Sequence, residues 1–407
     1  MSSSTLVSAT LNTAGAPGSA HAVLSRRLQA LAPSPTISWS ARAKTLARQG
    51  ANILDLTLGE PDFDTFPHVK AAAEQAIRDG KTKYTPAGGV PELKSAIGEK
   101  FSRENGVQYQ PDEIVVCVGG KQALYNAMLA VCDPGDEVLV PVPTWPTFSE
   151  QIAFVGAVPV HVPMAPDHRL RASDLEPYIT PRTRAVILNS PSNPTGAVMR
   201  PEDVRAVTEL AVSRQIYVVS DETYEHFLYD DARHVTPASL GPEAKSWTIE
   251  VNTVSKTYAM TGWRIGYLAA RPEIVKAVDG LMSQTTSNAC SIAQWAAVAA
   301  LNGPQEGAQE MVGAFAARRR RFIAGLHALG FECAWPEGAF YAYMRVPPRE
   351  DGSAGDSVAF ANRLLEEGHI ATVPGHAFFD EGSLRVSYAA SQAVLDEALQ
   401  RLAPFAP

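Results

Sequence analysis

The feature that most constrains the fold is the alternation of short apolar runs with helical patterns through the middle of the chain. Helical spacing appears, for example, at 121–132 and 201–215. The apolar runs that read as strands lie at 113–120, 136–143, 157–164, 184–191, 216–222 and 246–256. Strands separated by helices form βαβ units, in which helices cover both faces of a mostly parallel sheet. We therefore predict an α/β fold built on such a sheet.

The chain changes character after residue 305, where a separate α+β domain is expected. The pattern predicts a helix, a hairpin, a second helix and a strand, in that order, at 305–329, 331–346, 356–367 and 383–388. A helix expected at 20–31 has no place in the parallel sheet, so the segment before residue 65 is assigned to the same domain. The predicted domains are a small one, 23–65 with 305–407, and a large one, 66–304.

Composition excludes several classes of protein. The 407 residues are 45% apolar and 19% charged, which is ordinary for a globular protein. No run of 18 apolar residues occurs, so no membrane partner is expected. A net charge of −8 argues against a nucleic-acid partner. The four cysteines contain no C-x-x-C pair, which is typical of a reducing compartment, and a cytoplasmic location is expected.

Residues 1–22 need separate treatment because they carry no Lys, Arg, Asp or Glu. A secretory signal needs a basic region followed by an apolar one, and this segment has neither. We predict a disordered tail, with a weak targeting peptide as the alternative.

Two further patterns receive a structural interpretation. Arg318–Arg321 is a run of four arginines. Consecutive residues on a helix point in different directions, so the run predicts a solvated helix and no phosphate-binding stripe. The nine histidines show no metal-ligand spacing along the chain, and no metal site is expected.

Common enzyme motifs are absent. A P-loop is excluded because position 115 is Val where Gly is required, and no H-E-x-x-H or G-x-S-x-G occurs. No G-x-G-x-x-G follows a strand, which disfavours NAD-dependent hydride transfer. In open α/β sheets ligands bind beyond the carboxyl ends of the strands. Polar residues gather at those expected ends: Gly119, Gly120, Lys121, Asn193, Asp221, Tyr224 and Lys256.

One block is far more specific, SKTYAMTGWRIGY at 255–267, and six others accompany it in order. They are LTLGEPDFDT (56–65), GKTKYTPAGGVPELK (80–94), VGGKQALYN (118–126), NSPSNPTGAV (189–198), VVSDETYEH (218–226) and SLRVSYA (383–389). Through these blocks the chain resembles the pyridoxal-phosphate (PLP) aminotransferases of fold type I, class I, most closely their bacterial-type aspartate aminotransferase branch. The resemblance covers about residues 24–403 and implies a seven-stranded, mostly parallel sheet between helices plus a smaller α+β domain.

The resemblance implies roles for residues around the PLP ring. Lys256 matches the catalytic lysine that forms a Schiff base with PLP. Asp221 matches the carboxylate that pairs with the protonated pyridine nitrogen. Tyr224 and Asn193 match the donors to the phenolic oxygen, and Trp145 matches the aromatic that stacks on the ring.

The phosphate end of the cofactor is implied by a second group of residues. Arg264 matches a guanidinium that binds two phosphate oxygens, and Thr253 is favoured over Ser255 as the neighbouring hydroxyl donor. Gly119 and Gly120 precede a helix whose free N–H groups suit a phosphate, while a tight turn is the alternative. Tyr84 matches a tyrosine that reaches the phosphate of a neighbouring subunit, so a homodimer with shared sites is expected.

Substrate recognition follows from the same resemblance. Arg385 matches the clamp on the α-carboxylate, and Gly59 lies where backbone can approach that group. Lys121 matches a residue that helps to recognise a distal carboxylate, with a contact near the phosphate as the alternative. Trp145 and Asn193 are expected to contact substrate as well as cofactor.

The resemblance implies transamination by a ping-pong mechanism, with aspartate as donor and a 2-oxo acid such as 2-oxoglutarate as acceptor. The alternatives are a prephenate or aromatic aminotransferase, another specialised aminotransferase, and a PLP-dependent lyase on the same fold. Transcription regulators that use this fold carry a DNA-binding domain before it, and about 23 residues are too few for one.

Overall fold

The computed structural model describes residues 24–348 and 355–407. Residues 24–32 belong to a unit separate from the rest of the chain and contain the short helix α1, Arg26–Ala30. Ser25 caps this helix by accepting a hydrogen bond from the backbone N–H of Leu28. The tail predicted at 1–22, and the start of the helix predicted at 20–31, lie outside the described residues.

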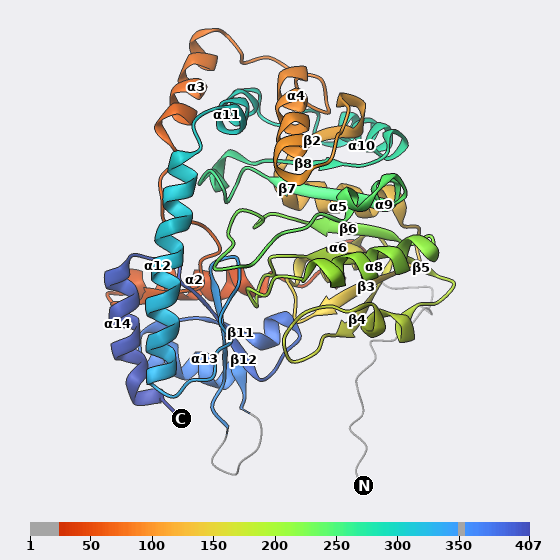
Figure 1. Cartoon of the computed structure of the whole chain (residues 1–407). Coiled ribbons are helices and arrows are strands. Elements are labelled where there is room, and N and C mark those ends of the chain that lie inside the picture. Colours follow the sequence, from red (N-terminus) through yellow and green to blue (C-terminus); the bar gives the residue numbers. More distant parts are fainter. Residues whose placement is uncertain (1–23, 349–354) are drawn as a thin grey trace. The chain divides into compact units, whose positions relative to one another are not determined.

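The body of the chain is built on one seven-stranded sheet (Figure 1). Its order is β2-β8-β7-β6-β5-β3-β4, and every strand except β8 runs in the same direction. The strands are β2 (Ile114–Val118), β3 (Glu137–Val142), β4 (Val158–Pro163), β5 (Thr183–Asn189), β6 (Tyr217–Asp221), β7 (Thr248–Thr253) and β8 (Ile265–Ala269). The predicted mostly parallel sheet of seven strands is confirmed, although β8 was not expected as a strand.

Helices cover both faces of this sheet because alternate strand residues point to opposite sides. Val115 and Cys117 of β2 face one core, whereas Ile114 and Val116 face another. The first face packs against α5 (Gly119–Val131), α6 (Thr147–Phe154) and α10 (Pro272–Thr285). The other face packs against α4 (Pro91–Lys100), α8 (Pro201–Ser213) and α11 (Ser291–Asn302). The strands are therefore buried on both sides, and their carboxyl ends open toward one edge.

A smaller part of the body has its own sheet and core. The sheet order is β11-β12-β9, and a separate parallel pair joins β1 to β10. The strands are β1 (Leu54–Asp55), β9 (Tyr341–Arg345), β10 (Ile370–Ala371), β11 (Val373–Pro374) and β12 (Ser383–Ser387). The helices here are α2 (Pro35–Arg48), α12 (Glu306–Ala328), α13 (Ser357–Glu366) and α14 (Gln392–Leu402), with aromatic side chains such as Phe315 and Phe340 at the centre of the core.

Two local expectations, about a hairpin and about the helices, need correction or completion. Only one antiparallel bridge, between Cys333 and Met344, joins the two halves of the hairpin predicted at 331–346. Helix α2 was not predicted, and α3 (Pro67–Arg78), α7 (Ala172–Leu175) and α9 (Pro242–Trp247) complete the helices.

In the parts of the chain that the structure describes, no helix combines the length and apolarity needed to cross a membrane. The domain bounds at residues 65 and 305 stay a prediction.

The expectation of a solvated arginine run is wrong for Arg319. This side chain is only 2% exposed and lies between the rings of Tyr229 and Trp335, at 5.1 and 5.2 Å. Its guanidinium pairs with Asp230 at 2.8 Å and donates to the carbonyl of Pro336. Helix α12 is covered on this side by the 229–232 and 335–337 segments, so one arginine of the four faces protein instead of water.

Candidate active site

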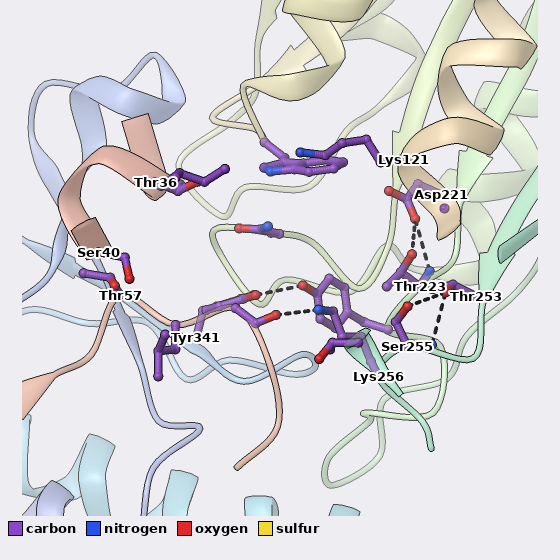
Figure 2. Close-up of a pocket in the computed structure, with 18 of the residues that line it drawn as sticks. Thr36, Ser40, Thr57, Lys121, Asp221, Thr223, Thr253, Ser255, Lys256 and Tyr341 are labelled. Atoms are coloured by element: carbon purple, nitrogen blue, oxygen red, sulfur yellow. Dashed lines mark hydrogen bonds between the residues drawn. The ribbon is translucent and has the colours of Figure 1, made fainter. Parts of the chain in front are cut away.

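A cavity of about 470 Å³ lies at the carboxyl ends of β6 and β7 and reaches across to α2 and β12 (Figure 2). Eleven of the predicted site residues line it: Gly59, Gly120, Lys121, Trp145, Asn193, Asp221, Tyr224, Thr253, Lys256, Arg264 and Arg385. They come from segments as far apart in sequence as residues 59 and 385, so the fold brings together what the sequence only predicted to be close.

Asp221 ends strand β6 and is buried at the bottom of this cavity. Its Oδ1 accepts hydrogen bonds from the backbone N–H and the hydroxyl of Thr223, at 3.2 and 2.7 Å. Burial raises the pKa of Asp221 to about 6, against the effect of these two bonds. A carboxylate in such a place is stabilised by a cationic partner, since an opposite charge favours its ionised form.

Lys256 follows β7, and its ammonium Nζ donates to the carbonyl of Gly59 at 2.5 Å. Burial lowers the pKa of Lys256 to about 8, opposed by Glu60 and assisted by the charges of Arg264 and Arg385. At pH 7 roughly a tenth of this side chain is therefore a neutral amine, far more than for a lysine with the ordinary pKa of about 10.4. That state is the one that can act as a nucleophile or accept a proton.

The N-terminus of α5 meets Arg264 at one end of the cavity. Gly119 has a positive φ of 78°, and a Cβ there would collide with the Arg264 guanidinium, so both conformation and space require glycine. Arg264 itself has a left-handed backbone, with φ of 57°. Such a conformation is uncommon for a bulky residue and is concentrated at ligand sites. Helix N–H groups, a helix dipole and a guanidinium together make a site for an anion.

Two hydroxyls stand beside this anion site. Thr253 Oγ1 and Ser255 Oγ lie 2.7 Å apart, and both residues line the cavity. Thr253 also donates to the carbonyl of Ile265 at 2.7 Å. Because a hydroxyl has one hydrogen, Ser255 is then the donor in its contact with Thr253, and either residue would have to turn its hydroxyl to donate to a ligand. Both residues are therefore candidates, and Thr253 stays a prediction.

Arg385 lies on β12 and is only 2% exposed. Its Nη1 donates to Asn193 Oδ1 at 2.9 Å and its Nη2 to the carbonyl of Thr57 at 2.8 Å. Its Nε is buried and makes no hydrogen bond within the described chain. A buried guanidinium without a carboxylate partner is costly, because its charge is left uncompensated. The arrangement therefore favours an anionic ligand at this position.

Tyr341 is a pocket residue that the sequence analysis missed. Its ring lies 4.5 Å from the Arg385 guanidinium, and its hydroxyl is 2.7 Å from that of Tyr224. A Cβ on Gly59 would approach the Tyr341 hydroxyl to 3.1 Å, so glycine keeps this corner open. Burial raises the pKa of Tyr224 well above its ordinary value, which keeps its hydroxyl protonated as a donor.

Lys121 and Trp145 form the opposite wall. The Lys121 ammonium lies 4.9 Å from the centre of the Trp145 ring, a cation–π contact. Burial and the nearby Arg264 charge lower the pKa of Lys121. Within the described chain no carboxylate pairs with this ammonium, so its charge is available to a ligand.

Further cavity residues could have been found only in part. Thr223 lies two residues after Asp221, so a carboxylate–x–hydroxyl pattern at a strand end was a usable signal. Thr36, Ser40 and Lys44 of α2 also line the cavity, and Figure 2 places Thr36 and Ser40 on one helix facing it. Their spacing of four puts them on one helix face, but α2 itself was not predicted.

Tyr84 and Gly119 are the two predicted site residues that do not line the cavity. Gly119 supports it from behind through its contact with Arg264. Tyr84 is 91% exposed, which is extreme for a large aromatic side chain. Within the described residues its ring makes no aromatic or cation–π contact.

Most of the chain matches known proteins closely. The family model for class I and II aminotransferases matches residues 51–402. An aspartate/prephenate aminotransferase of Thermus thermophilus is 46% identical over 93% of this chain and 98% of that protein, and an aspartate aminotransferase of Rhizobium meliloti is 46% identical over 93% and 94%. The solved structure of the Thermus thermophilus aspartate aminotransferase with maleate superimposes with a TM-score of 0.90 at 45% identity, covering 95% of this chain and all of that one. The chain therefore belongs to the class I and II aminotransferase family.

Proposed function

We propose that the protein transfers the amino group of aspartate to a 2-oxo acid such as 2-oxoglutarate, with PLP as its cofactor. The observation that carries the proposal is that Lys256, with its lowered pKa, shares one cavity with the buried Asp221 and with Arg385. These are a nucleophilic amine, a carboxylate able to pair with a ring cation, and a guanidinium in need of an anion. The names of the relatives support the same activity.

The cavity fits PLP at both of its ends. The N–H groups of α5 at Gly120 and the Arg264 guanidinium would hold the phosphate, and Asp221 would pair with the pyridine nitrogen. Tyr224 and Asn193 would donate to the phenolic oxygen, and Trp145 would lie against the ring. When bound, PLP supplies an electron sink for the charge that develops at the Cα of the substrate.

The protein's own residues then divide the work. Arg385 binds the α-carboxylate through two parallel N–H donors and so fixes the orientation of the Cα–H bond. Lys256, as a neutral amine, would accept the proton from the substrate Cα at its Nζ and deliver it to the cofactor carbon that lies across the amino nitrogen. Asp221 keeps a proton on the ring nitrogen. Strand β12 carries Arg385. Together with helices α12–α14, this strand would close over the substrate and exclude water.

Lys121 supports the choice of a dicarboxylic substrate. Its ammonium lies over the Trp145 ring, and the residue lines the same cavity as Arg385. Within the described chain this ammonium has no carboxylate partner. The relative of Thermus thermophilus was solved with maleate, a dicarboxylate. A prephenate or aromatic activity is the second candidate, because a relative from Thermus thermophilus is named for prephenate as well as aspartate.

Replacing Lys121 with methionine should lower kcat/KM for aspartate by roughly 30-fold or more, since a lost partner of a buried charge pair costs about 2–5 kcal/mol. Methionine keeps an apolar stem over Trp145 and removes only the charge. Phenylalanine as donor should be much less affected, because it has no distal carboxylate. Lys121→Arg, which keeps the cation, should retain most of the aspartate activity. Equal losses for aspartate and phenylalanine would assign Lys121 to the phosphate or the fold.

We further infer a homodimer in which Tyr84 serves the neighbouring subunit's site. Support comes from the 91% exposure of its side chain, which a partner would cover. Helix α11 follows the exposed Cys290 on the same side of the sheet as α4. A cytoplasmic location is inferred with it, supported by four free cysteines, and cell fractionation would check it.

Mixed dimers test the sharing of sites. Tyr84→Phe and Lys256→Ala subunits, combined after partial denaturation, should give hybrids with one doubly altered and one intact site. Activity should then rise toward about half that of the wild type in the hybrid fraction. Hybrids no more active than their parents, or a monomer by light scattering, would rule out the cross-subunit role of Tyr84.

A further inference from the structure

The turn that follows β6 has two sides with different surroundings. Asp221, Thr223 and Tyr224 line the cavity, whereas the carboxylates of Glu222 and Glu225 lie in the protein interior. Glu222 is fully buried and Glu225 is 7% exposed. Buried carboxylates are costly unless they are paired and hydrogen-bonded, so two of them within four residues require a structural explanation.

Glu225 is the centre of the first set of contacts. The ammonium of Lys100, whose side chain is 1% exposed, donates to Glu225 Oε1. The amides of Asn252 and Asn105 donate to Oε1 and Oε2, at 2.5 and 2.7 Å. Although burial raises it, the positive charges of Lys100, His226 and His234 hold the pKa of Glu225 well below its ordinary value. Glu225 is therefore a fixed negative charge tied to α4 and β7.

Glu222 is the centre of the second set. Ser220 donates to its Oε1 at 2.8 Å, and His234 Nε2 lies 3.0 Å from its Oε2. Thr236 Oγ1 lies 2.6 Å from Oε1 of both Glu222 and Glu250. One hydroxyl hydrogen cannot serve two carboxylates, so one of them carries a proton. Burial and Glu222 raise the pKa of Glu250, which makes Glu250 the protonated one.

The charges of this interior then balance. Although burial opposes it, Glu222 raises the pKa of His234 and favours the imidazolium. Lys100 and His234 thus offset Glu225 and Glu222. Two groups in the described residues have ligand atoms close enough for a metal ion, Glu104/Glu225/His226 and Glu222/Glu225/His234. The Lys100 ammonium already places a positive charge on Glu225. Protonated side chains therefore explain the charge balance of this site better than a metal ion does.

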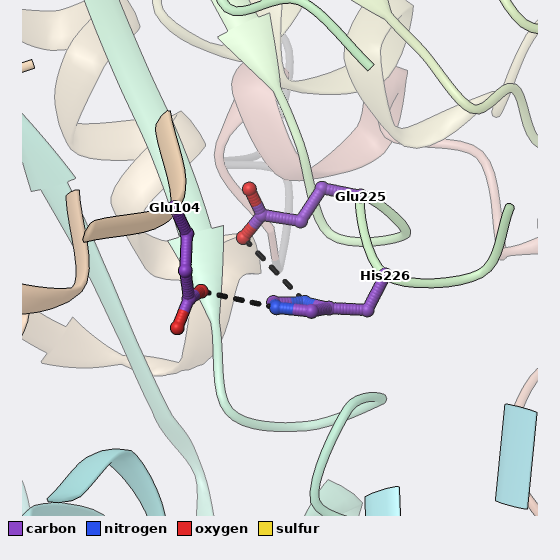
Figure 3. Close-up of side chains that lie close together, drawn as sticks. All are labelled: Glu104, Glu225 and His226. Atoms are coloured by element: carbon purple, nitrogen blue, oxygen red, sulfur yellow. Dashed lines mark hydrogen bonds and ion pairs between the residues drawn. The ribbon is translucent and has the colours of Figure 1, made fainter. Parts of the chain in front are cut away.

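A connection also reaches the residue after Lys256. The last turn of α4 widens into a π-helical segment, Phe101–Asn105, which directs Glu104 and Asn105 toward the β6 turn. His226 Nε2 lies 3.0 Å from Glu104 Oε2, and its Nδ1 lies 3.8 Å from Glu225 Oε1 (Figure 3). The same Nδ1 is 3.1 Å from the hydroxyl of Thr257, next to Lys256.

We propose that Lys100, Glu222, Glu225 and His234 form a buried positioning cluster that holds the Asp221–Tyr224 turn in the geometry the PLP site requires. The inference rests on the proposed function, because it takes Asp221 and Tyr224 as cofactor contacts. The cluster does not touch the cavity. It acts by fixing the backbone from which Asp221 and Tyr224 project, in the way that outer contacts orient the residues of other sites.

The test compares three variants of the PLP-bound enzyme with the wild type. Asn105→Ala removes one donor to Glu225 and leaves all charges in place. Lys100→Met with Glu225→Gln removes both charges together, so no buried charge is left unpaired. Glu209→Gln, from the exposed pair Arg205–Glu209, is the control. Measured quantities are kcat, KM for aspartate, Tm, and the pH at which the visible absorbance of bound PLP changes.

We expect the spectroscopic midpoint to move up by about 0.5–1 pH unit in the double variant, because the Tyr224 hydroxyl would stabilise the phenolic oxygen less well. The value of kcat should fall by about 10-fold with KM for aspartate nearly unchanged, since misplacement weakens the chemistry more than binding by Arg385. Asn105→Ala should also raise the midpoint and lower kcat, but by less than the double variant. Glu209→Gln should change neither the midpoint nor kcat.

Other outcomes distinguish a failure of the cluster proposal from a failure of the proposed function. A lower Tm with an unchanged midpoint and unchanged kcat, in either cluster variant, would show that the cluster serves stability alone. If the double variant does not fold, the midpoint, kcat and Tm of Asn105→Ala decide between a positioning role and a role in stability alone. A wild-type protein without the spectrum of bound PLP would contradict the proposed function itself, and the cluster proposal with it.

Discussion

Replacing Lys256 with alanine is expected to lower kcat by at least about 10³-fold, because the residue supplies both the covalent attachment of the cofactor and the proton transfer at Cα. The structure gives the physical basis: burial and two nearby guanidinium groups lower the pKa of this lysine to about 8. The variant should also lack the visible absorbance of lysine-bound PLP. Steady-state kinetics and absorbance spectra of the purified variant measure both effects.

Two controls make this result specific to Lys256. Lys276→Ala removes an exposed lysine from α10 and should leave rate and spectrum unchanged. Borohydride reduction of the wild type followed by peptide mapping should place the pyridoxyl group on Lys256. A modified peptide that contains another lysine would overturn the assignment.

Replacing Arg385 with alanine is expected to lower kcat/KM for all α-amino acids together, by roughly 30-fold to several thousand-fold, from a lost buried pair worth about 2–5 kcal/mol. Arg385 is held by Asn193 and Thr57, and its Nε has no hydrogen-bond partner among the described residues, so its fork is oriented before substrate arrives. Kinetics with aspartate, glutamate and phenylalanine provide the measurement.

Arg385→Lys is the matched variant, since it keeps the charge and loses the planar fork. It should recover only part of the loss, because one ammonium cannot maintain the bonds to Asn193 and Thr57 and also bind both carboxylate oxygens. A loss confined to dicarboxylic donors would mean that Arg385 binds the distal carboxylate, and the roles of Arg385 and Lys121 would be exchanged.

The parallel sheet could be predicted because its strands are buried on both faces and are continuous apolar runs, as at Ile114–Val118 and Tyr217–Asp221. Strand β8 escaped prediction because its short run, Ile265–Ala269, directly follows the Arg264 turn without a separating helix. Helix α2 escaped because its sequence, PTISWSARAKTLAR, has only Ala43 buried and so carries no clear apolar stripe.

The candidate site could be predicted where its residues lie in recognisable sequence motifs, as for Lys256, Asp221 and Arg385. Tyr341 could not, because its position beside Arg385 and Tyr224 depends on how β9 pairs with β12. The burial of Arg319 and Glu225 depends on contacts between distant segments and leaves no trace in local periodicity. Long-range pairing is the information that a single sequence lacks.

Single half-reactions of the PLP-bound enzyme show whether the protein transaminates aspartate. Without any 2-oxo acid, aspartate and glutamate should each discharge the visible absorbance in one stoichiometric turnover, and 2-oxoglutarate should restore it. Phenylalanine should react more slowly at equal concentration. Continuous product formation from aspartate without a 2-oxo acid would indicate a lyase, and a faster reaction with aromatic donors than with aspartate would contradict the proposed substrate.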